Sequence, residues 1–322
     1  MSGHADQHIV PQFLLKHWHR GADERLSAFR WADGKLRSSR FKAKSVAKAR
    51  HIYSMQRSKA APDVRAERDF LGPKVDDPAA VVHKEILETG VRSLNDEDKQ
   101  TWSAFLVSLM LRGQSMMLHM RARGRAILGA GLDETPDEYQ AVRGDDPAPT
   151  LRTWIEKHHP DQLEDLAVQA LPELVFSQKL NLPLLNGCTS ATRRLSTAPH
   201  DLLMSDSPLI YVGTLDKGFI VALPIAPQMA FFAVKPRETW DNIAKLTDRA
   251  IVRELNLHIC QTTDQYVYST GIAQELFIKK HLPHRHRRSH ARTRADTPGH
   301  GQAGRQTACG EPGPGAGAVN GQ

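Results

Sequence analysis

Several polar residues lie at the ends or on the faces of otherwise apolar segments, where active sites are often built: His8, Arg112, Asp206 and Asn256. An imidazole and a carboxylate can act as a base with its orienting partner, or as metal ligands. We therefore expect His8 and Asp206 to be catalytic, and Arg112, Asn256 and Ser205 to bind substrate in the same pocket. This arrangement would suit a hydrolytic or phosphodiester-cleaving enzyme, and the sequence leaves the reaction type, the metal and any cofactor open.

His8 and Asp206 each have a structural alternative. His8 lies just before a predicted helix that begins near Pro11, where the helix dipole disfavours the charged imidazolium. A neutral imidazole there is a possible base or metal ligand, or a partner for a backbone carbonyl. Asp206 comes two residues before Pro208, and an aspartate in that position commonly accepts backbone N–H bonds in a turn.

The two substrate-binding candidates on predicted helices also have alternatives. Arg112 follows an uncharged run, so it binds a phosphate or carboxylate bidentately or else pairs within the protein. Asn256 falls in the apolar stripe of its helix, where an unpaired amide costs about 1–3 kcal/mol. It therefore either fastens the neighbouring strands or contacts a substrate. Cys260, in the same stripe, is better explained as a buried inert thiol than as a nucleophile.

Several known site patterns are missing from the sequence. It has no phosphate-binding GxxxxGK[ST] loop, no GxGxxG after a strand, no HExxH and no GxSxG. The spacing of His4, His17 and His19 matches no compact zinc site. The common nucleotide-binding and metalloprotease classes are therefore unsupported.

Local patterns predict the elements that would position these residues. The runs from Leu26 to Trp31 and from Leu36 to Phe41 flank Asp33-Gly34, a strong hairpin signal. Between residues 80 and 180 the chain is mainly helical. Asn95 caps a helix whose apolar stripe runs from Trp102 to Met120, and residues 133–149 form a loop.

The second half changes to strands. Four short apolar runs between residues 202 and 234 alternate with turn residues, which indicates antiparallel strands. Thr247 then caps a helix that contains Asn256. We predict an α+β fold in which the N-terminal hairpin joins the later strands in one antiparallel sheet, with the central helices as a separate layer.

The charge is concentrated at the C-terminus. The chain has 43 Lys and Arg against 36 Asp and Glu, and the segment 284–322 contains six arginines and two acidic residues. This segment has almost no bulky apolar residues, so we predict one globular domain over residues 1–283 and a disordered basic tail over residues 284–322. The alternative to an enzyme is a non-catalytic protein that binds nucleic acid or an acidic partner through this tail.

Composition also indicates the compartment. The three cysteines form no CxxC pair, and the N-terminus has no basic and then apolar signal segment, so we expect a cytoplasmic protein. The longest uncharged stretch, residues 218–234, has 17 residues and two prolines. A bilayer span needs about 20 residues, so we expect no membrane association.

The motifs in this order resemble a bacterial family known as domain of unknown function 4238. The matching segments are His8 to Leu15, Ser45-Val46-Ala47, Ile52-Tyr53, the helix from Trp102 to Arg112, Leu203 to Pro208, Leu255-Asn256 and Val267-Tyr268-Ser269. They span nearly all of residues 8–270. Ser207 stands where the family usually has Asn, and Trp18 where it has another aromatic residue. The family has no assigned activity, so the resemblance implies one full-length domain and no mechanism.

Overall fold

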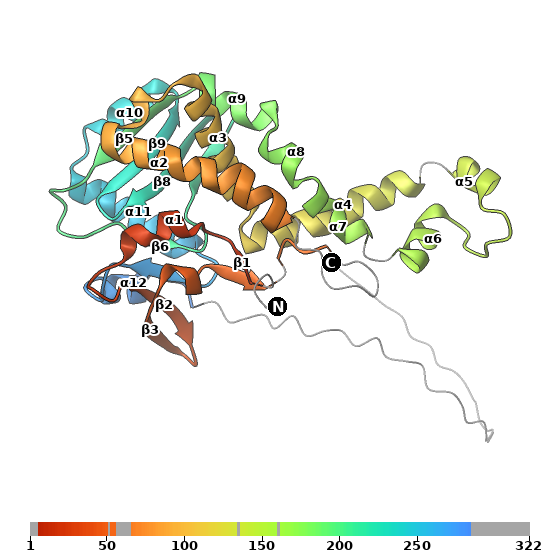
Figure 1. Ribbon diagram of the computed structural model, residues 1–322, viewed down its shortest axis with the longest axis horizontal. Coiled ribbons are helices and arrows are strands. Elements are labelled where there is room, and N and C mark those ends of the chain that lie inside the picture. Colours follow the sequence, from red (N-terminus) through yellow and green to blue (C-terminus); the bar gives the residue numbers. More distant parts are fainter. Residues whose placement is uncertain (1–5, 51, 56–65, 134–135, 160–161, 285–322) are drawn as a thin grey trace, which may run out of the picture. The chain divides into compact units, whose positions relative to one another are not determined.

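The computed structural model describes residues 6–50, 52–55, 66–133, 136–159 and 162–284, and Figure 1 shows their arrangement. They belong to one compact unit that extends from Met1 to Arg285. The predicted basic tail lies, apart from His284, outside the described residues, and its disorder and its partners stay predictions.

The first four-stranded sheet contains the N-terminal hairpin. Strands β2 (Leu26–Ala32) and β3 (Lys35–Phe41) are antiparallel. Asp33 and Gly34, which connect them, have φ angles of 50° and 73°, and a two-residue turn of this hand needs positive φ at both positions. Strand β10 (Val267–Ser269) pairs with β2, and β6 (Met204–Ser205) pairs with β10. The predicted hairpin is confirmed, and it lies in the same sheet as Ser205.

The remaining long strands form a second sheet, in the order β5–β9–β8–β7. Its strands are β5 (Thr189–Arg194), β7 (Ile210–Thr214), β8 (Gly218–Ala226) and β9 (Met229–Lys235). The sequence predicted that the hairpin and the later strands form a single sheet. Instead, β7, β8 and β9 pair in the second sheet. Of the strands predicted between residues 202 and 234, only the two-residue strand β6 lies in the sheet of the hairpin. Strand β5 was not predicted, because only Ala191 of its six residues is fully buried.

Helices cover the second sheet as a separate layer, as predicted. Helix α2 (Asp77–Thr89) contacts β8 through a 2.9 Å hydrogen bond between His83 Nε2 and the carbonyl of Ile225. Helix α3 (Asp96–Leu111) contacts β9, with the rings of Trp102 and Phe231 5.7 Å apart. Both helices cross this sheet in Figure 1. The predicted cap is confirmed, since Asn95 Oδ1 accepts the N–H of Asp98 at 2.9 Å.

The stripe predicted to run through Met120 is interrupted after Leu111. Helix α3 ends there and α4 (Gln114–Asp133) begins three residues later. The break has tertiary causes: the Arg112 side chain pairs with Asp76, and the carboxylate of Asp264 accepts the backbone N–H of Ser115 at the start of α4.

The other elements complete the chain. They are β1 (Asp6–His8), β4 (Lys48–Arg50), the short helices α1 (Gln12–Leu15), η1 (Lys16–Trp18), η2 (Ala43–Ser45) and η4 (Val91–Ser93), the π-helical segment η3 (Ala66–Asp76), and α5 (Pro136–Val142), α6 (Leu151–His158), α7 (Gln162–Gln169), α8 (Leu171–Val175), α9 (Gln178–Asn186), α10 (Arg237–Ala244), α11 (Asp248–Thr262) and α12 (Glu275–His281). Helix α5 replaces part of the loop predicted over residues 133–149. It is supported by Tyr139, whose hydroxyl donates to the carbonyl of Ala148 at 3.1 Å. Thr247 caps α11 as predicted. None of the helices in the described segments is long and apolar enough to cross a membrane.

Candidate functional site

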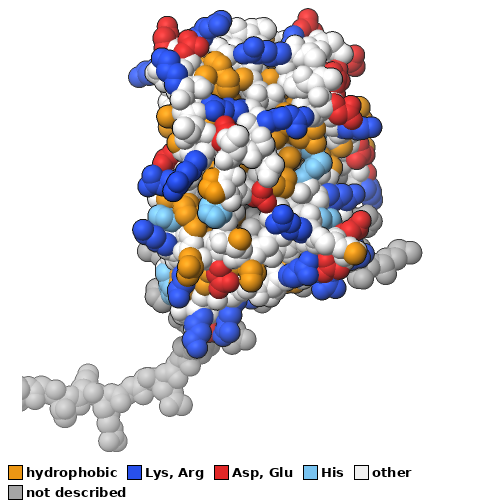
Figure 2. Space-filling model, turned by 90° about the vertical axis from the view of Figure 1, so that its left-hand side faces the viewer, with side chains coloured by type: hydrophobic (Ala, Val, Ile, Leu, Met, Phe, Trp, Pro, Cys, Tyr) orange, Lys and Arg blue, Asp and Glu red, His pale blue; other side chains and the backbone are white. Residues whose placement is uncertain are grey.

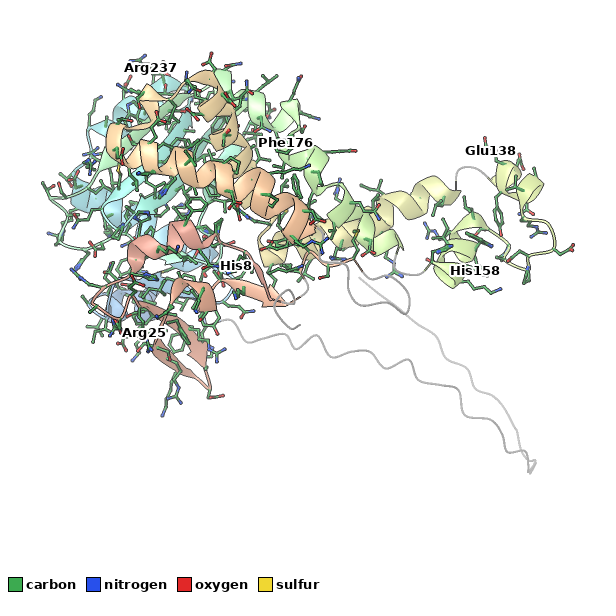
Figure 3. All side chains as sticks on the ribbon, viewed as in Figure 1. His8, Arg25, Glu138, His158, Phe176 and Arg237 are labelled. Carbon is green, nitrogen blue, oxygen red and sulfur yellow. The ribbon has the colours of Figure 1, made fainter. Side chains whose placement is uncertain are left out.

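His8, labelled in Figure 3, ends strand β1. It contacts Glu67 of η3. Its backbone N–H donates to Glu67 Oε1 at 3.2 Å, and its ring Nδ1 lies 3.8 Å from the same oxygen. The other ring nitrogen, Nε2, lies 3.2 Å from the side-chain nitrogen of Gln12. In the tautomer in which Nε2 accepts from this amide nitrogen, the ring proton is on Nδ1, on the side of Glu67. An imidazole with a carboxylate on its Nδ1 side has the order of groups of a general base and its orienting partner, although the 3.8 Å separation is longer than a hydrogen bond.

The His8–Glu67 pair is partly open to solvent. The side chains are 20% and 23% exposed. The second carboxylate oxygen of Glu67, Oε2, is nevertheless buried and has no hydrogen-bond partner among the described residues. A buried carboxylate oxygen normally finds a donor, so Glu67 keeps an unused accepting position beside His8.

Arg112 lies in a buried cluster that includes Asp76 and Tyr53. Its guanidinium binds Asp76 with two hydrogen bonds, of 3.0 and 2.7 Å, and the hydroxyl of Tyr53 donates to its backbone carbonyl at 2.5 Å. Burial raises the pKa of Asp76, and Arg112 opposes this shift. Burial also raises the pKa of Tyr53, and the charge of Glu67 contributes to the same shift. The cluster is therefore electrostatically coupled to the His8–Glu67 pair. The guanidinium of Arg112 binds a carboxylate of the protein itself, Asp76, through both of its hydrogen bonds.

Asp206 organises the loop between α11 and β10. One oxygen accepts from the hydroxyl of Thr263 at 2.6 Å and the N–H of Asp264 at 2.9 Å, and the other from the N–H groups of Gln265 and Tyr266 at 2.8 and 2.9 Å. Burial raises its pKa to about 6, while the hydrogen bonds from Thr263 and Tyr266 lower it. The side chain thus accepts backbone N–H bonds, but from a loop about 60 residues away, so the prediction that it binds its own turn is wrong.

Asn256 and Ser205 also have partners within the protein. The side-chain oxygen of Asn256 accepts the N–H of Leu203 at 2.7 Å, and its nitrogen donates to the carbonyl of Asp201 and to Gln274, both at 3.0 Å. The Ser205 hydroxyl accepts the N–H of Ser207 at 3.1 Å. These bonds fix the segment 201–207, which carries Asp206, so Asn256 fastens the strand as one of its alternatives predicted.

Asp206 lines a cavity of about 150 Å³, together with Ile9, Lys48, Gln114 and Tyr268 among others. Ile9 and Gln114 follow His8 and Arg112 closely in the chain, whereas no residue of the helix that carries Asn256 lines this cavity. His8 lies directly opposite Lys48 in the β1–β4 pairing. Side chains at opposite positions of an antiparallel pair share one face, with Cβ atoms about 4.5–5.5 Å apart. His8 is therefore next to a lining residue of the cavity that Asp206 also lines.

The structure adds two residues that the sequence did not single out. Glu67 and Lys48 both lie in charged, unpatterned segments, where a carboxylate or an ammonium group resembles any surface residue. Lys48 has no ion pair with another described residue. Its proximity to His8 depends on the β1–β4 pairing, for which the three-residue strands give almost no sequence signal.

The described part of the chain shows no group of three or more His, Cys, Asp or Glu side chains that could hold a metal ion. Its two cysteines, Cys188 and Cys260, are free. Burial raises the pKa of Cys260 to about 12, which suits an inert thiol.

These features define an α+β protein with two four-stranded antiparallel sheets, the two-stranded β1–β4 sheet, a helical layer and a polar site where the N-terminal segment meets the segments around residues 48, 206 and 266. The chain belongs to the family described as protein of unknown function (DUF4238), whose model matches residues 6–271. This match confirms the resemblance seen in the sequence. Comparisons with curated proteins and with solved structures gave no match.

Proposed function

We propose that the protein is a hydrolase of esters, with phosphodiesters as the favoured substrates, and that His8 is its general base. The observation that supports this most directly is the partly exposed His8 ring, with Glu67 on its Nδ1 side, beside a cavity that Lys48 and Asp206 line. Of the residues expected to be catalytic or substrate-binding, His8 is the one with a reactive atom near solvent.

The residues would divide the chemistry as follows. His8 Nε2 takes a proton from water, and the water oxygen attacks the phosphorus or carbonyl carbon. The bond to the leaving oxygen then breaks with its electron pair, and His8 returns the proton to that oxygen. Glu67 holds the Nδ1 proton and stabilises the imidazolium that forms. Gln12, now 3.2 Å from Nε2, would turn aside or hold the attacking water.

Lys48 would bind the negatively charged oxygens of the substrate, a role that the sequence assigned to Arg112. A cavity of about 150 Å³ lies below the range of about 300–1,000 Å³ typical of small-molecule sites, so we expect it to take one phosphate-sized group and not a whole nucleotide. Asp206 lines this cavity, and Arg112, Asn256 and Ser205 bind Asp76, Leu203 and Ser207, so all four would be positioning residues.

The test is hydrolysis of bis(p-nitrophenyl) phosphate and p-nitrophenyl acetate by the wild type and by His8→Asn, Glu67→Gln and Lys48→Met. We expect His8→Asn to lose about 10²–10⁴-fold in rate, and Lys48→Met to raise KM for the phosphodiester more than for the uncharged acetate. His119→Asn, at an exposed histidine of α4, is the matched control and should keep full activity. No hydrolysis by the folded wild type, or full activity in His8→Asn, would contradict the proposal.

The alternative of a nucleic-acid-binding protein depends on the segment after His284. Figure 2 shows one face of the molecule, on which Lys and Arg side chains are spread among acidic, apolar and histidine side chains. A nucleic-acid site usually gathers such charges into a patch or stripe. If the alternative holds, deleting residues 284–322 will abolish salt-dependent binding of DNA or RNA.

A further inference from the structure

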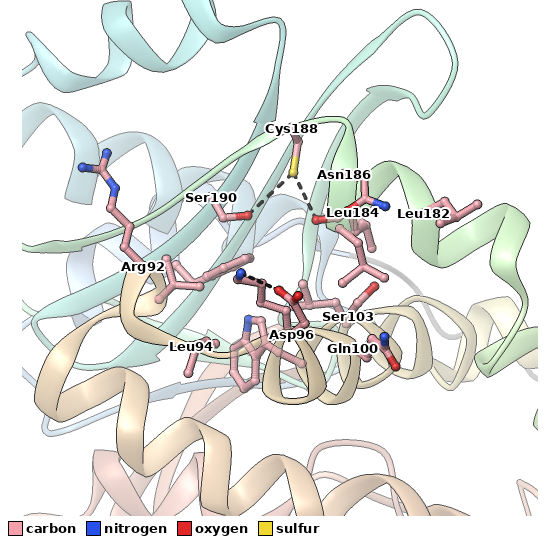
Figure 4. A pocket seen from close by; sticks show the side chains of 16 residues that line it. Arg92, Leu94, Asp96, Gln100, Ser103, Leu182, Leu184, Asn186, Cys188 and Ser190 are labelled. Carbon is pink, nitrogen blue, oxygen red and sulfur yellow. Dashed lines mark hydrogen bonds and ion pairs between the residues drawn. The ribbon is translucent and has the colours of Figure 1, made fainter.

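A second and larger cavity lies between α3, α9 and the second sheet (Figure 4). Its volume is about 550 Å³, within the range of about 300–1,000 Å³ typical of small-molecule sites. It shares no lining residue with the cavity beside His8, so it is independent of the proposed hydrolytic function.

Most of its wall is aliphatic. The apolar lining includes Leu94, Leu106, Leu182, Leu184, Leu185 and Phe231. Helices α3 and α9 supply the leucines other than Leu94, which precedes α3, and β9 supplies the phenylalanine. A wall of this composition favours a flexible hydrocarbon body over a flat polar ring system.

The polar groups at the edge carry a net positive charge. Lys99 pairs with Asp96 at 3.0 Å, whereas the exposed Arg92 has no ion pair with any described residue. Figure 4 shows Arg92 and Asp96 at this cavity. An arginine without a carboxylate partner is well suited to bind an anionic group through two parallel hydrogen bonds.

Trp102 provides a second polar group in the lining. The residue is only 2% exposed, and its indole Nε1 is buried without a hydrogen-bond partner among the described residues. Buried tryptophan N–H groups usually have an acceptor. The ring itself is held firmly, stacked on His83 at 6.1 Å and edge-on to Phe231 at 5.7 Å. It therefore presents an unused donor from a fixed position.

We propose that this cavity binds a small amphipathic carboxylate, with its aliphatic chain among the leucines and its carboxylate between Arg92 and the Trp102 N–H. The aliphatic chain matches the apolar wall, the negative charge matches the unpaired Arg92, and the acceptor oxygens match the unpartnered Trp102 N–H.

Octanoate is the probe, and Cys188 reports occupancy. The Cys188 thiol lines the cavity and donates to the carbonyl of Leu184 at 3.2 Å. In the full chain carrying Cys309→Ser, only Cys188 and the fully buried Cys260 remain, so alkylation by iodoacetamide at alkaline pH follows Cys188. We expect millimolar octanoate to slow this alkylation, and calorimetry to give a matching Kd.

Variants separate the two contacts. We expect Trp102→Phe to weaken octanoate binding about tenfold or more, since a hydrogen bond to a charged acceptor is lost, and Arg92→Gln to weaken it in a salt-dependent way. Trp240→Phe is the matched control, because Trp240 packs on Phe232 outside the cavity. If Trp102→Phe does not fold, Arg92→Gln and the alkylation assay decide.

Three results would overturn the proposal. The first is an alkylation rate that octanoate does not change, and the second is equal affinity in the wild type and in folded Trp102→Phe. The third is binding of uncharged 1-octanol as tightly as octanoate, which would remove the role of the carboxylate. Because none of these measurements involves His8, their failure leaves the hydrolase proposal untouched, and the reverse also holds.

Discussion

Replacing Arg112 with Met tests whether this arginine serves the fold or an external ligand. Its guanidinium makes hydrogen bonds of 3.0 and 2.7 Å to Asp76, and the two side chains are 1% and 16% exposed. Removing one partner of such a buried pair leaves an uncompensated charge, which costs about 3–5 kcal/mol of unfolding free energy. The Tyr53 hydroxyl binds the backbone carbonyl of residue 112, so that hydrogen bond survives the substitution.

The double variant Arg112→Met with Asp76→Leu makes the test sharper. Replacing both charges by apolar groups of similar size is often neutral or stabilising by about 1–4 kcal/mol. We therefore expect the double variant to be more stable than either single variant in urea unfolding. The deficit of Arg112→Met should also shrink in acid, because the pKa of Asp76, already raised by burial, loses the opposing effect of the guanidinium. If the losses of the two single variants simply add in the double variant, the two side chains are not coupled and this reasoning is wrong.

Two further predictions concern pH. Burial lowers the pKa of His83 from 6.5 to about 4, so His83 contributes up to about 3 kcal/mol of stability that is lost as pH drops through this window, and His83→Gln should lack this contribution in acid titrations followed by circular dichroism. Burial raises the pKa of Asp206 from 3.8 to about 6, so its ionisation weakens the fold as pH rises from about 4 to 6, also by up to about 3 kcal/mol. The wild type should therefore lose stability relative to Asp206→Asn over that range, and a constant difference would mean that the four donors keep the carboxylate ionised throughout. Because the two effects have opposite signs, each variant should show a steeper pH dependence than the wild type.

The parts of the fold that the sequence predicted correctly depend on local chemistry. Asp33-Gly34 specifies a hairpin turn through its own backbone preferences, and Asn95 and Thr247 cap helices within three residues of themselves. The division into two sheets and the break after Leu111 depend on partners far away in the chain. The pairing of Met204 with Tyr268 and the contact of Ser115 with Asp264 are examples, and no local pattern records them.

The site was harder to predict for a different reason. A buried polar side chain is equally unusual in sequence whether its partner is a ligand or the protein, and the partners of Asp206 and Asn256 become known only when the distant segments are in place. The informative observation is then which buried polar atoms have no hydrogen-bond partner. Among the described residues these are Glu67 Oε2, Arg112 Nε and Trp102 Nε1. The first two lie in the charged cluster beside His8 but outside the lining of the smaller cavity, whereas the third lines the larger cavity and is the one unused position that faces a proposed ligand.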